Sequence, residues 1–334
     1  MKIAVLYNYD FAHLPEGVER RSQDAVLGVA AAVETALRAR GAQVSMVPAG
    51  PEPFGFIDAL VALEPDLVIN LCESLAGDSR GEMLVPGLLD LAGLPHTGSG
   101  ALALSIALHK SMAKDLLRGH KVSTPASALV TQPSDLEGLE IALPAIVKPA
   151  HEDASIGIDR RSVVHDRRAL AEVCERVMRD HRQPALVEQY IDGRELNVAL
   201  LGNPPQVLPV TEIDFTGLDP SCPRIVTYAA KWDESSPEYH GTPPVPCRLE
   251  PQLEARVFAT ARAAFTTLGC RDYGRVDIRL SNDGVPYVIE VNPNCDLSPD
   301  AGFARAAAAS GLGYEALVWK LVEIATARLA PRRS

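Results

Sequence analysis

The sequence lacks several features that mark other classes of protein. No apolar run approaches the roughly 20 residues of a membrane-spanning helix, and the opening MKIAVLYNYD has no signal-peptide organisation. The six cysteines include no Cys-x-x-Cys pair, which argues against a zinc site or a disulfide framework. The net charge of −11 argues against a nucleic-acid partner, because such a partner requires a basic face. We therefore expect a cytoplasmic protein with reduced thiols and no membrane or nucleic-acid partner.

Lysine is also scarce. It supplies only seven of the 32 basic residues, so a lysine in an apolar or glycine-rich context is more informative than usual. The hydrophobic content of 47% and the charged content of 22% are ordinary for a globular protein. At 334 residues the chain is long enough for two or three domains with cores of their own.

The first hundred residues predict alternating strands and helices. Apolar runs and helical spacing indicate strands at residues 2–7, 43–47 and 66–71, and helices at residues 24–40, 56–63 and 81–92. This order is typical of a parallel sheet covered by helices, which binds ligands at the carboxyl ends of its strands. Two loops at that edge carry charged side chains, among them Glu19 and Glu73. Long solvated loops are the alternative explanation.

A lysine at the end of a short strand marks the next unit. The strand at residues 145–148 ends in Lys148 and is followed by a loop with Ser155 and Gly157. A cation beside free backbone N–H groups is a common arrangement for binding phosphate, although a surface lysine beside a turn is the alternative. A Walker A loop is absent. A helix at 167–179 and a strand at 185–190 complete this unit.

The last unit contains a long segment without periodicity. Residues 216–246 are rich in proline and include Lys231 and Trp232. Segments of this length in a compact domain are usually functional lids or disordered, so we expect a lid loop. Around it, the sequence predicts strands at residues 194–201 and 207–213 and helices at residues 253–268 and 314–329.

Residues 271–300 predict a β-hairpin with charged groups on one face. The Asp283-Gly284 pair is a strong signal for a two-residue turn. Counting outward from that turn places Asp277 opposite Glu290 and Arg275 opposite Asn292, all on one face. The other face, expected to be the core face, takes Val276, Ile278, Leu280, Tyr287, Ile289 and Val291.

The facing pair of carboxylates in this hairpin is compatible with a metal site. Two carboxylates directly across a sheet repel each other, so the pair persists most easily with a cation between them. Carboxylate and amide oxygens are the ligands that Mg²⁺ prefers, which makes Asp277, Glu290 and Asn292 candidate ligands. An ordinary hairpin with a solvated polar face is the alternative, and the hairpin alone does not decide between the two.

Three segments resemble, in the right order, the D-alanine–D-alanine ligases of the ATP-grasp superfamily. They are LPHTGSGALALSIALHK, PAIVKPAHEDASIGI and GRVDIRLSNDGVPYVIEVNPN. The resemblance implies an α/β, ATP-grasp fold with an N-terminal parallel domain at 1–108 and two α+β domains at 109–187 and 188–334 that clasp ATP. It also implies a reaction, in which ATP phosphorylates a carboxylate and an amine attacks the acyl phosphate to give an amide, ADP and phosphate. It further implies ATP and two Mg²⁺ ions, replaceable by Mn²⁺, as cofactors, and a homodimer.

The resemblance implies a role for each matching residue. Phosphate groups are expected at Lys110 and Lys148, adenine at Glu188, Gln189 and Ile191, ribose at Glu195, and magnesium at Asp277, Glu290 and Asn292. Arg275 is expected to stabilise the charge that develops at the reacting centre, and Lys231 to close over the phosphates with the lid. The chemistry agrees, because phosphoryl transfer needs cations at the phosphate oxygens and an acyl phosphate must be kept from water.

The resemblance fails at the residues that would choose the substrates. The family's loop Glu-Gly-Ser-Ser-x-Gly has Ala154 in place of its first serine and keeps only Ser155, and the lid's Lys-Tyr pair is Lys231-Trp232. The N-terminal glutamate that joins this serine and tyrosine in the family is expected at Glu19. The family's second-substrate segment is rewritten here as Pro293, Asn294, Cys295, Asp296, Leu297 and Ser298. Cys295 has no activating histidine nearby in the sequence, so lining of the pocket is a better reading than a nucleophile.

The sequence therefore predicts an ATP-dependent carboxylate–amine ligase whose nucleotide residues are kept and whose amino-acid pocket is changed. We expect amino-acid or peptide substrates other than two D-alanines, in a specialised biosynthetic pathway. Alternatives are a genuine D-alanine–D-alanine ligase of cell-wall synthesis and an enzyme that stops at the acyl phosphate. A non-catalytic nucleotide-binding regulatory protein belongs to another class, and the joint presence of the charged residues argues against it.

Overall fold

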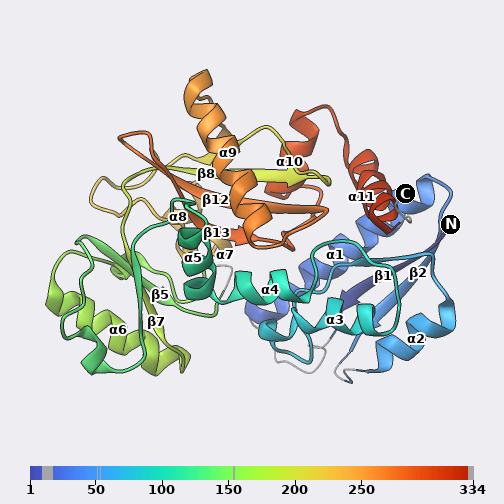
Figure 1. Cartoon of the computed structure of the whole chain (residues 1–334), viewed down its shortest axis with the longest axis horizontal. Helices are drawn as coiled ribbons and strands as arrows, with labels where there is room; N and C mark the ends of the chain where they lie inside the picture. Colours follow the sequence, from blue (N-terminus) through green and yellow to red (C-terminus); the bar gives the residue numbers. More distant parts are fainter. Residues whose placement is uncertain (10–17, 51, 53, 153–154, 330–334) are drawn as a thin grey trace.

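The computed structural model describes residues 1–9, 18–50, 52, 54–152 and 155–329, with the side chains of residues 18–25 left out. Within these ranges, no helix combines the length and the apolarity that crossing a membrane would require. Strands and helices form three units, each built on its own sheet. Figure 1 shows the short helix α4 (Ala101–Leu108) lying between the N-terminal sheet and the other two, and α5 (Lys110–Gly119) continuing from it between the middle and C-terminal units.

The N-terminal unit is the predicted parallel sheet. Strands β1 (Lys2–Asn8), β2 (Gln43–Ala49) and β3 (Leu67–Asn70) have the order β2-β1-β3, and both pairings are parallel. Its helices are α1 (Val18–Ala39), α2 (Gly55–Leu63) and α3 (Leu84–Leu91). Helix α1 begins six residues earlier than the sequence predicted, and Gly41, with a φ of 78°, follows its end as expected.

The middle unit carries Lys148. Its sheet has the order β4-β7-β5-β6 and consists of β4 (Ser127–Val130), β5 (Ala145–Pro149), β6 (Val163–Val164) and β7 (Ala185–Gln189). Helix α6 (Arg167–His181) presents Leu170, Val173 and Val177 to this sheet, as its amphipathic spacing predicted. The sequence analysis missed β4 and β6, which are short edge strands with little periodicity of their own.

The C-terminal unit is organised around the predicted hairpin. Its sheet runs β11-β10-β8-β12-β13, with β9 pairing only to β8. The strands are β8 (Gly193–Leu201), β9 (Gln206–Val207), β10 (Thr211–Ile213), β11 (Pro244–Pro246), β12 (Tyr273–Ser281) and β13 (Pro286–Asn292). The single strand predicted at 207–213 is wrong, because Pro209 has no N–H to donate and the chain pairs on either side of it.

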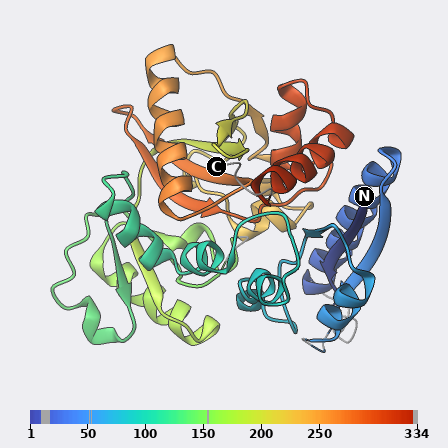
Figure 2. The same cartoon turned by 45° about the vertical axis from the view of Figure 1, so that its right-hand side comes forward.

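Three helices complete the C-terminal unit and connect it to the N-terminal one. They are α9 (Pro251–Thr267), α10 (Gly302–Ala309), which the sequence analysis missed, and α11 (Tyr314–Leu329). Leu317, Leu321 and Ala325 of α11 share one core with Val33 and Leu37 of α1. Figures 1 and 2 accordingly show the last helix beside the first. The C-terminal helix therefore closes the core of the N-terminal sheet.

The segment at 216–246 is not the structureless loop that we predicted. It contains helices α7 (Tyr228–Trp232) and α8 (Pro237–His240) as well as strand β11. Each helix starts at a side-chain cap: Thr227 Oγ1 accepts from Ala230 N at 3.1 Å, and Ser236 Oγ accepts from Tyr239 N at 3.0 Å. Helices this short do not show a helical repeat of apolar residues, so the sequence predicted a loop here.

The hairpin has the predicted pairing near Asp277, but its turn and its register close to the turn differ from the prediction. Asp277 faces Glu290 and Arg275 faces Asn292, as predicted. The turn has three residues between Ser281 and Val285, with Gly284 at a φ of 71°, and a bulge beside Asp277 offsets the extra residue. Between turn and bulge every side chain of β13 therefore changes face. Pro286 and Val288 are buried there, and the predicted core positions Tyr287 and Ile289 are not.

Candidate active site

The charged face of β12 and β13 brings three of the predicted residues together. Arg275 binds Asp277 with two hydrogen bonds, Nε to Oδ1 at 2.7 Å and a terminal nitrogen to Oδ2 at 2.8 Å. Asn292 Nδ2 donates to Asp277 Oδ2 at 3.1 Å, and Asn197 Nδ2 on β8 donates to Oδ1 at 2.9 Å. Burial alone would lower the pKa of Arg275. The Asp277 carboxylate outweighs burial and raises this pKa above its ordinary value, so the guanidinium is a permanent cation.

Glu290 connects this face to the helix that carries Lys110. Glu290 Oε1 lies 2.9 Å from Lys110 Nζ, which also donates to the carbonyl oxygen of Glu152 at 2.5 Å. Burial works to raise the pKa of Glu290, yet Lys110, Lys148 and Arg275 together lower it. Glu290 is therefore ionised, and the two facing carboxylates of the hairpin are each balanced by a neighbouring cation.

A second charged cluster lies between α5 and the middle sheet. Glu188 Oε1 is 2.9 Å from Lys148 Nζ and 3.3 Å from Lys114 Nζ, and all three side chains are almost fully buried. These contacts are ion pairs and not well-directed hydrogen bonds, since Oε1 has no hydrogen-bond partner of good geometry. Lys114 Nζ donates to Thr124 Oγ1 at 3.0 Å, and Thr124 Oγ1 donates to the carbonyl of Val288 at 2.8 Å. The cluster thus joins the middle sheet to strand β13.

The opposing pKa shifts in this cluster have clear causes. Burial lowers the pKa of Lys114 to about 8, and the nearby Glu188 only partly restores it. Burial raises the pKa of Glu188, but the two lysines outweigh burial and lower it overall. At neutral pH Lys114 is therefore protonated and Glu188 is ionised.

The predicted nucleotide residues of the hinge lie at the end of strand β7 and directly after it. The Glu188 side chain points to the two lysines, whereas Gln189 is held by its backbone, with N donating to Ala126 O at 2.8 Å. Ile191 is buried, and Glu195 near the start of β8 is 9% exposed. Burial raises the pKa of Glu195, and Arg279 is the largest influence in the opposite direction.

Arg279 is a residue of this site that the sequence analysis missed. It lies on β12 directly opposite Glu195 on β8, with its guanidinium nitrogen 3.5 Å from Glu195 Oε2. The alternation of a strand could have found it, because Arg275, Asp277 and Arg279 share one face. Its side chain is 4% exposed, which marks it as more than a surface cation.

The segment at 216–246 rests on the loop that follows Lys148. Tyr228 N donates to Ile158 O at 2.9 Å, and Arg160 Nε lies 2.5 Å from Glu238 Oε1. Lys231 Nζ lies 5.6 Å from the centre of the Trp232 ring. Lys231 has an exposed surface, but the protein atoms around its ammonium group lower its pKa, and the charges of Arg275, Glu290, Asp277 and Glu73 also act on it. Lys231 therefore lies within electrostatic range of the charged face of the hairpin.

The rewritten segment 293–298 borders the N-terminal unit. Asn294 Nδ2 donates to Cys72 O at 2.9 Å and to Glu82 Oε1 at 2.7 Å, and its Oδ1 accepts from the buried Tyr273 hydroxyl at 2.9 Å. Ser298 donates from N and Oγ to Asp296 Oδ1, at 2.8 and 2.5 Å. Asn294 thus acts as a structural bridge as well as a candidate pocket residue.

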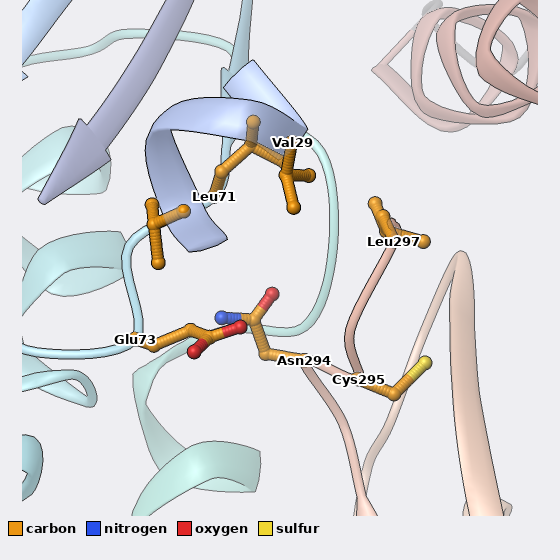
Figure 3. Close-up of a pocket in the computed structure, with 7 residues that line it drawn as sticks. Val29, Leu71, Glu73, Asn294, Cys295 and Leu297 are labelled. Carbon is orange, nitrogen blue, oxygen red and sulfur yellow. The ribbon is translucent and has the colours of Figure 1, made fainter. Parts of the chain in front are cut away.

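A small cavity marks where this segment meets the end of β3. Its volume of about 10 Å³ is roughly what one water molecule needs. Figure 3 shows the Glu73 and Asn294 head groups together on one side and the Cys295 thiol directed away from them. Burial raises the pKa of Cys295 to about 12, so the thiol stays protonated and is not a nucleophile. The cavity is lined by Val26, Val29, Leu71, Glu73, Asn294, Cys295 and Leu297.

Two predicted substrate residues are less fully placed. Ser155 follows residues 153–154, which lie outside the described residues, and has a φ of 62°, the left-handed conformation that only a few side chains adopt. Glu19 lies in helix α1, but its side chain is outside the described part of the structure. The predicted contact between Glu19, position 154 and the lid is therefore not described by this structure.

The side chains at the hairpin fit a magnesium site. Asp277 and Glu290 are two carboxylates that face each other across a strand pair, and Asn292 adds an amide group beside them. Carboxylate and amide oxygens form a hard donor set, and Arg275 and Lys110 satisfy these carboxylates here. Among the described residues, no group of three or more histidine, cysteine, aspartate or glutamate side chains is arranged to hold a metal. The predicted set has only two carboxylates. A metal ion there would therefore also need the Asn292 amide oxygen and oxygen atoms of a bound ligand.

Comparisons with known proteins identify the family of this chain. Residues 130–323 match the family model described as D-ala D-ala ligase C-terminus. The chain is 34% identical over 265 residues to the uncharacterized protein y4sG of Sinorhizobium fredii, covering 78% of this chain and 75% of that protein. It is 32% identical over 308 residues to a D-alanine–D-alanine ligase of Chromohalobacter salexigens, covering 90% of this chain and 92% of that enzyme.

Solved structures show the same fold. The D-alanine–D-alanine ligase of Bacillus anthracis, solved in complex with ATP, has a TM-score of 0.75 and 22% identity, and the match covers 98% of both chains. The ligase of Coxiella burnetii has a TM-score of 0.73 and 18% identity, covering 98% of this chain and 94% of that one. These likenesses confirm the predicted ATP-grasp fold. Together with the sequence matches, they show that the chain belongs to the D-alanine–D-alanine ligase family and is an ATP-dependent, ADP-forming ligase that makes C–N bonds.

Proposed function

We propose that this enzyme couples a carboxylate to an amine through an acyl phosphate, with amino-acid or peptide substrates other than a pair of D-alanines. The observation that carries the nucleotide part is the shared carboxylate of Glu188. Lys114 and Lys148 are both buried and share this carboxylate as an ion-pair partner. A buried cation without a counter-ion is costly, and the chain as a whole carries a net charge of −11. A phosphate group of ATP at Lys148 is the anion that would balance the cluster.

Magnesium would be held by Asp277, Glu290 and Asn292, as two ions that Mn²⁺ can replace. Bound there, the metal would supply positive charge that offsets the charge of the phosphate oxygens. Lys110 already meets Glu290, so this ammonium group lies where metal and phosphate would come together. Arg275 is held in a fixed orientation by Asp277 and would offer its free N–H groups to the oxygen of a tetrahedral intermediate.

The lid has the chemical task of excluding water. An acyl phosphate hydrolyses readily, so the reaction requires a closed site. The segment at 216–246 touches the loop after Lys148 through Tyr228 and Glu238, and the charges of the hairpin act on its Lys231. We propose that Gln189 and Ile191 receive adenine and that Glu195 receives the ribose hydroxyls. The Glu188 side chain would support Lys148 instead of reading the base.

The altered substrate pocket supports the choice of other substrates. The family's first-substrate contact needs a serine and a tyrosine where this chain has Ala154 and Trp232. The replaced segment 293–298 forms an apolar wall with Cys295 and Leu297, with Glu73 at its edge. We also propose that Trp232, Asp296 and Ser298 line the substrate pocket.

Two other functions give different results in the same assay. The sequence relatives named D-alanine–D-alanine ligase favour a genuine D-alanine–D-alanine ligase with a variant pocket. A non-catalytic nucleotide-binding protein is disfavoured by the contacts themselves, since Lys110, Lys148, Arg275, Asp277 and Glu290 are all paired within one site. Loss of function is expected to free such residues from one another.

A phosphate-release screen tests the proposal. The purified protein is given Mg·ATP with D- and L-amino acids and small peptides, singly and in pairs, and products are identified by mass. Asp277→Ala, checked for folding by circular dichroism, is the blank. We expect release above this blank and an amide product for a pair other than two D-alanines. If D-alanine alone gave the highest rate, the genuine ligase would replace our proposal, and Mg·ATP binding without any release would make the protein non-catalytic.

We further propose a three-domain division at residues 1–108, 109–187 and 188–334, a cytoplasmic location and a homodimer. All six cysteines are free, which suits a reducing compartment. Three leucines on α3 and α4 are more than half exposed, Leu84, Leu91 and Leu102, and a second copy of the chain would cover them. A sedimentation mass near that of one 35.8 kDa chain would contradict the dimer.

A further inference from the structure

Arg279 makes more contacts than a strand residue needs. Its guanidinium lies 5.5 Å from the ring of Tyr190 and 5.5 Å from the ring of Phe215. One terminal nitrogen donates to Gly193 O at 3.3 Å and lies 3.5 Å from Glu195 Oε2, and the other donates to Arg224 O. Both terminal nitrogens of the guanidinium are thus occupied, and two aromatic rings lie close to it.

These contacts belong to three segments that are far apart in the sequence. Tyr190 and Gly193 form the turn between β7 and β8, where the predicted adenine-binding residues lie. Phe215 and Arg224 begin the segment that carries the lid helices, and Tyr190 Oη also donates to Arg224 O, at 3.4 Å. Arg279 itself lies on β12, two residues beyond Asp277. One side chain therefore holds the first part of the lid against the hinge turn.

Glu195 depends on the same guanidinium. Its carboxylate is buried, and the charges that act on it are those of Arg279, Asp277, Arg275 and Lys148, in that order. Arg279 is the one among these with an ion-pair contact to it, at 3.5 Å. A buried carboxylate that loses its cation either takes up a proton or turns away. Either outcome would remove an acceptor for hydroxyl groups of a ligand.

We propose that Arg279 is a positioning residue that anchors the lid to the hinge turn and orients the Glu195 carboxylate, so that nucleotide binding and lid position depend on one another. This inference rests on the proposed nucleotide site. A residue that only fills the core would affect stability alone, whereas Arg279 contacts the lid base, the hinge and a predicted nucleotide ligand at once.

The carbonyl of Arg224 provides a direct readout that needs no nucleotide. Trypsin cleaves after arginine, and the Arg224 side chain is exposed, so the bond between Arg224 and Ile225 is a candidate cleavage site whose carbonyl Arg279 holds. We expect both Arg279→Met and Arg279→Lys to be cut there at least about tenfold faster than the wild type, because neither can bridge the carbonyl, the rings and Gly193 together. Arg194→Lys is the control, since Arg194 lies on the same sheet and binds Glu212, Cys247 and Arg248 instead of Arg224.

Kinetics separate the two tasks of Arg279. Lysine keeps a positive charge near Glu195 but lacks the fork. We therefore expect Arg279→Met to raise the KM for ATP about tenfold or more and Arg279→Lys to raise it less, while both variants are cut equally at Arg224. Tyr190→Phe removes only the second hydrogen bond to Arg224 O and should raise cleavage slightly with an unchanged KM. Thermal unfolding of each variant shows whether the fold is kept.

The outcomes distinguish this inference from the proposed function. If both Arg279 variants fold and match Arg194→Lys in cleavage rate and in KM, Arg279 is a core residue and the inference is wrong. If the wild type neither binds nor turns over ATP, the proposed function fails, whereas the cleavage rates still decide whether Arg279 anchors the lid. Slower cleavage of the wild type with Mg·ATP, and no such slowing in Arg279→Met, is the result expected if occupancy and lid position are coupled.

Discussion

Lys114 is a buried charged residue whose position is explained by the need of the site to bind an anion. Its ammonium group is 2% exposed and shares Glu188 with Lys148. An apolar side chain would fill the same space without the penalty of burying a charge. The cost of burying this charge is offset if the cluster binds an anion, because Lys114 then adds to the attraction of Lys148 for that anion.

The pH dependence of stability tests the buried state of Lys114. Its folded pKa of about 8 lies below the ordinary value of 10.5. Between these two values the unfolded chain holds a proton that the folded chain has released, so stability rises with pH across this window. The shift corresponds to on the order of 3 kcal/mol. Compared with Lys114→Met, the wild type should therefore gain about that much unfolding free energy between pH 8 and pH 10.5, measured by urea unfolding.

A surface lysine provides the comparison. Lys320 forms an exposed pair with Glu323 on α11, and Lys320→Met should show the same pH slope as the wild type. Equal slopes for the wild type, Lys114→Met and Lys320→Met would show that Lys114 is not buried in its charged form.

At the scale of elements, the hairpin shows what strand alternation can predict from the sequence and what it cannot. The alternation of β12 predicted which residues share the face of Asp277, and it also applied to Arg279. The pairing of Asp277 with Glu290 was predicted from a two-residue turn that does not exist. It holds because the bulge adds one residue to β13 where the turn adds one to the loop. A bulge is set by how the strand packs on its neighbours, which local sequence does not state.

The contact between lid and loop is the second element that invites a test. Glu238 reaches both Arg160 and Thr227, so it joins the lid to the loop after Lys148. Such a partly exposed pair contributes up to about 1 kcal/mol, or roughly a fivefold change in closed population. We expect Glu238→Gln to release up to roughly five phosphates per amide formed, because water reaches the acyl phosphate. The ratio is measured with a substrate pair from the screen.

Another lid glutamate serves as the control. Glu234 is exposed in the same segment, and Glu234→Gln should keep a ratio of one phosphate per amide. Trypsin cleavage after Lys231 gives a second measure of lid opening that does not depend on the substrate. Unchanged ratio and unchanged cleavage in Glu238→Gln would mean that the pair does not hold the lid.

At the scale of the whole molecule, one buried aspartate fastens the units together. Asp272 is fully buried and accepts from Gly98 N at 2.9 Å, from Asn203 Nδ2 at 2.7 Å and from Arg328 Nε at 2.9 Å. These partners belong to the turn before α4, to the turn after β8 and to α11. The N-terminal and C-terminal units therefore meet at a satisfied buried charge.

Removing that charge should destabilise the whole protein. Asp272→Asn keeps the shape and tolerates the left-handed φ of 66° at this position, but it leaves Arg328 without its counter-ion. We expect a loss of about 3–5 kcal/mol in unfolding free energy, measured by denaturant. Glu315→Gln breaks the exposed pair with Arg40, which also joins α11 to the N-terminal unit, and should cost less than about 1 kcal/mol. Similar losses for both variants would contradict a special role for Asp272.

Across the molecule, what the sequence predicted follows from periodicity. The parallel order of β1, β2 and β3, the helix α6 and the strand ending at Lys148 all have regular apolar spacing, and all are confirmed. Contacts between distant segments have no such signature. Neither Lys114 beside Glu188 nor Asn294 beside Glu82 could be predicted from spacing, because folding of the whole chain brings them together.

The packing of α11 on α1 has a consequence for how the protein is made. One face of the first sheet is covered by α2 and α3, which lie close to it in the sequence. Helix α1 covers the other face and shares its core with Phe303, Leu317 and Leu321, which lie far along the chain. During translation the apolar side of α1 that faces α11 therefore stays uncovered while about two hundred residues are added, at a rate of roughly 5–20 residues per second. That side of α1 is a natural site for a chaperone during the interval.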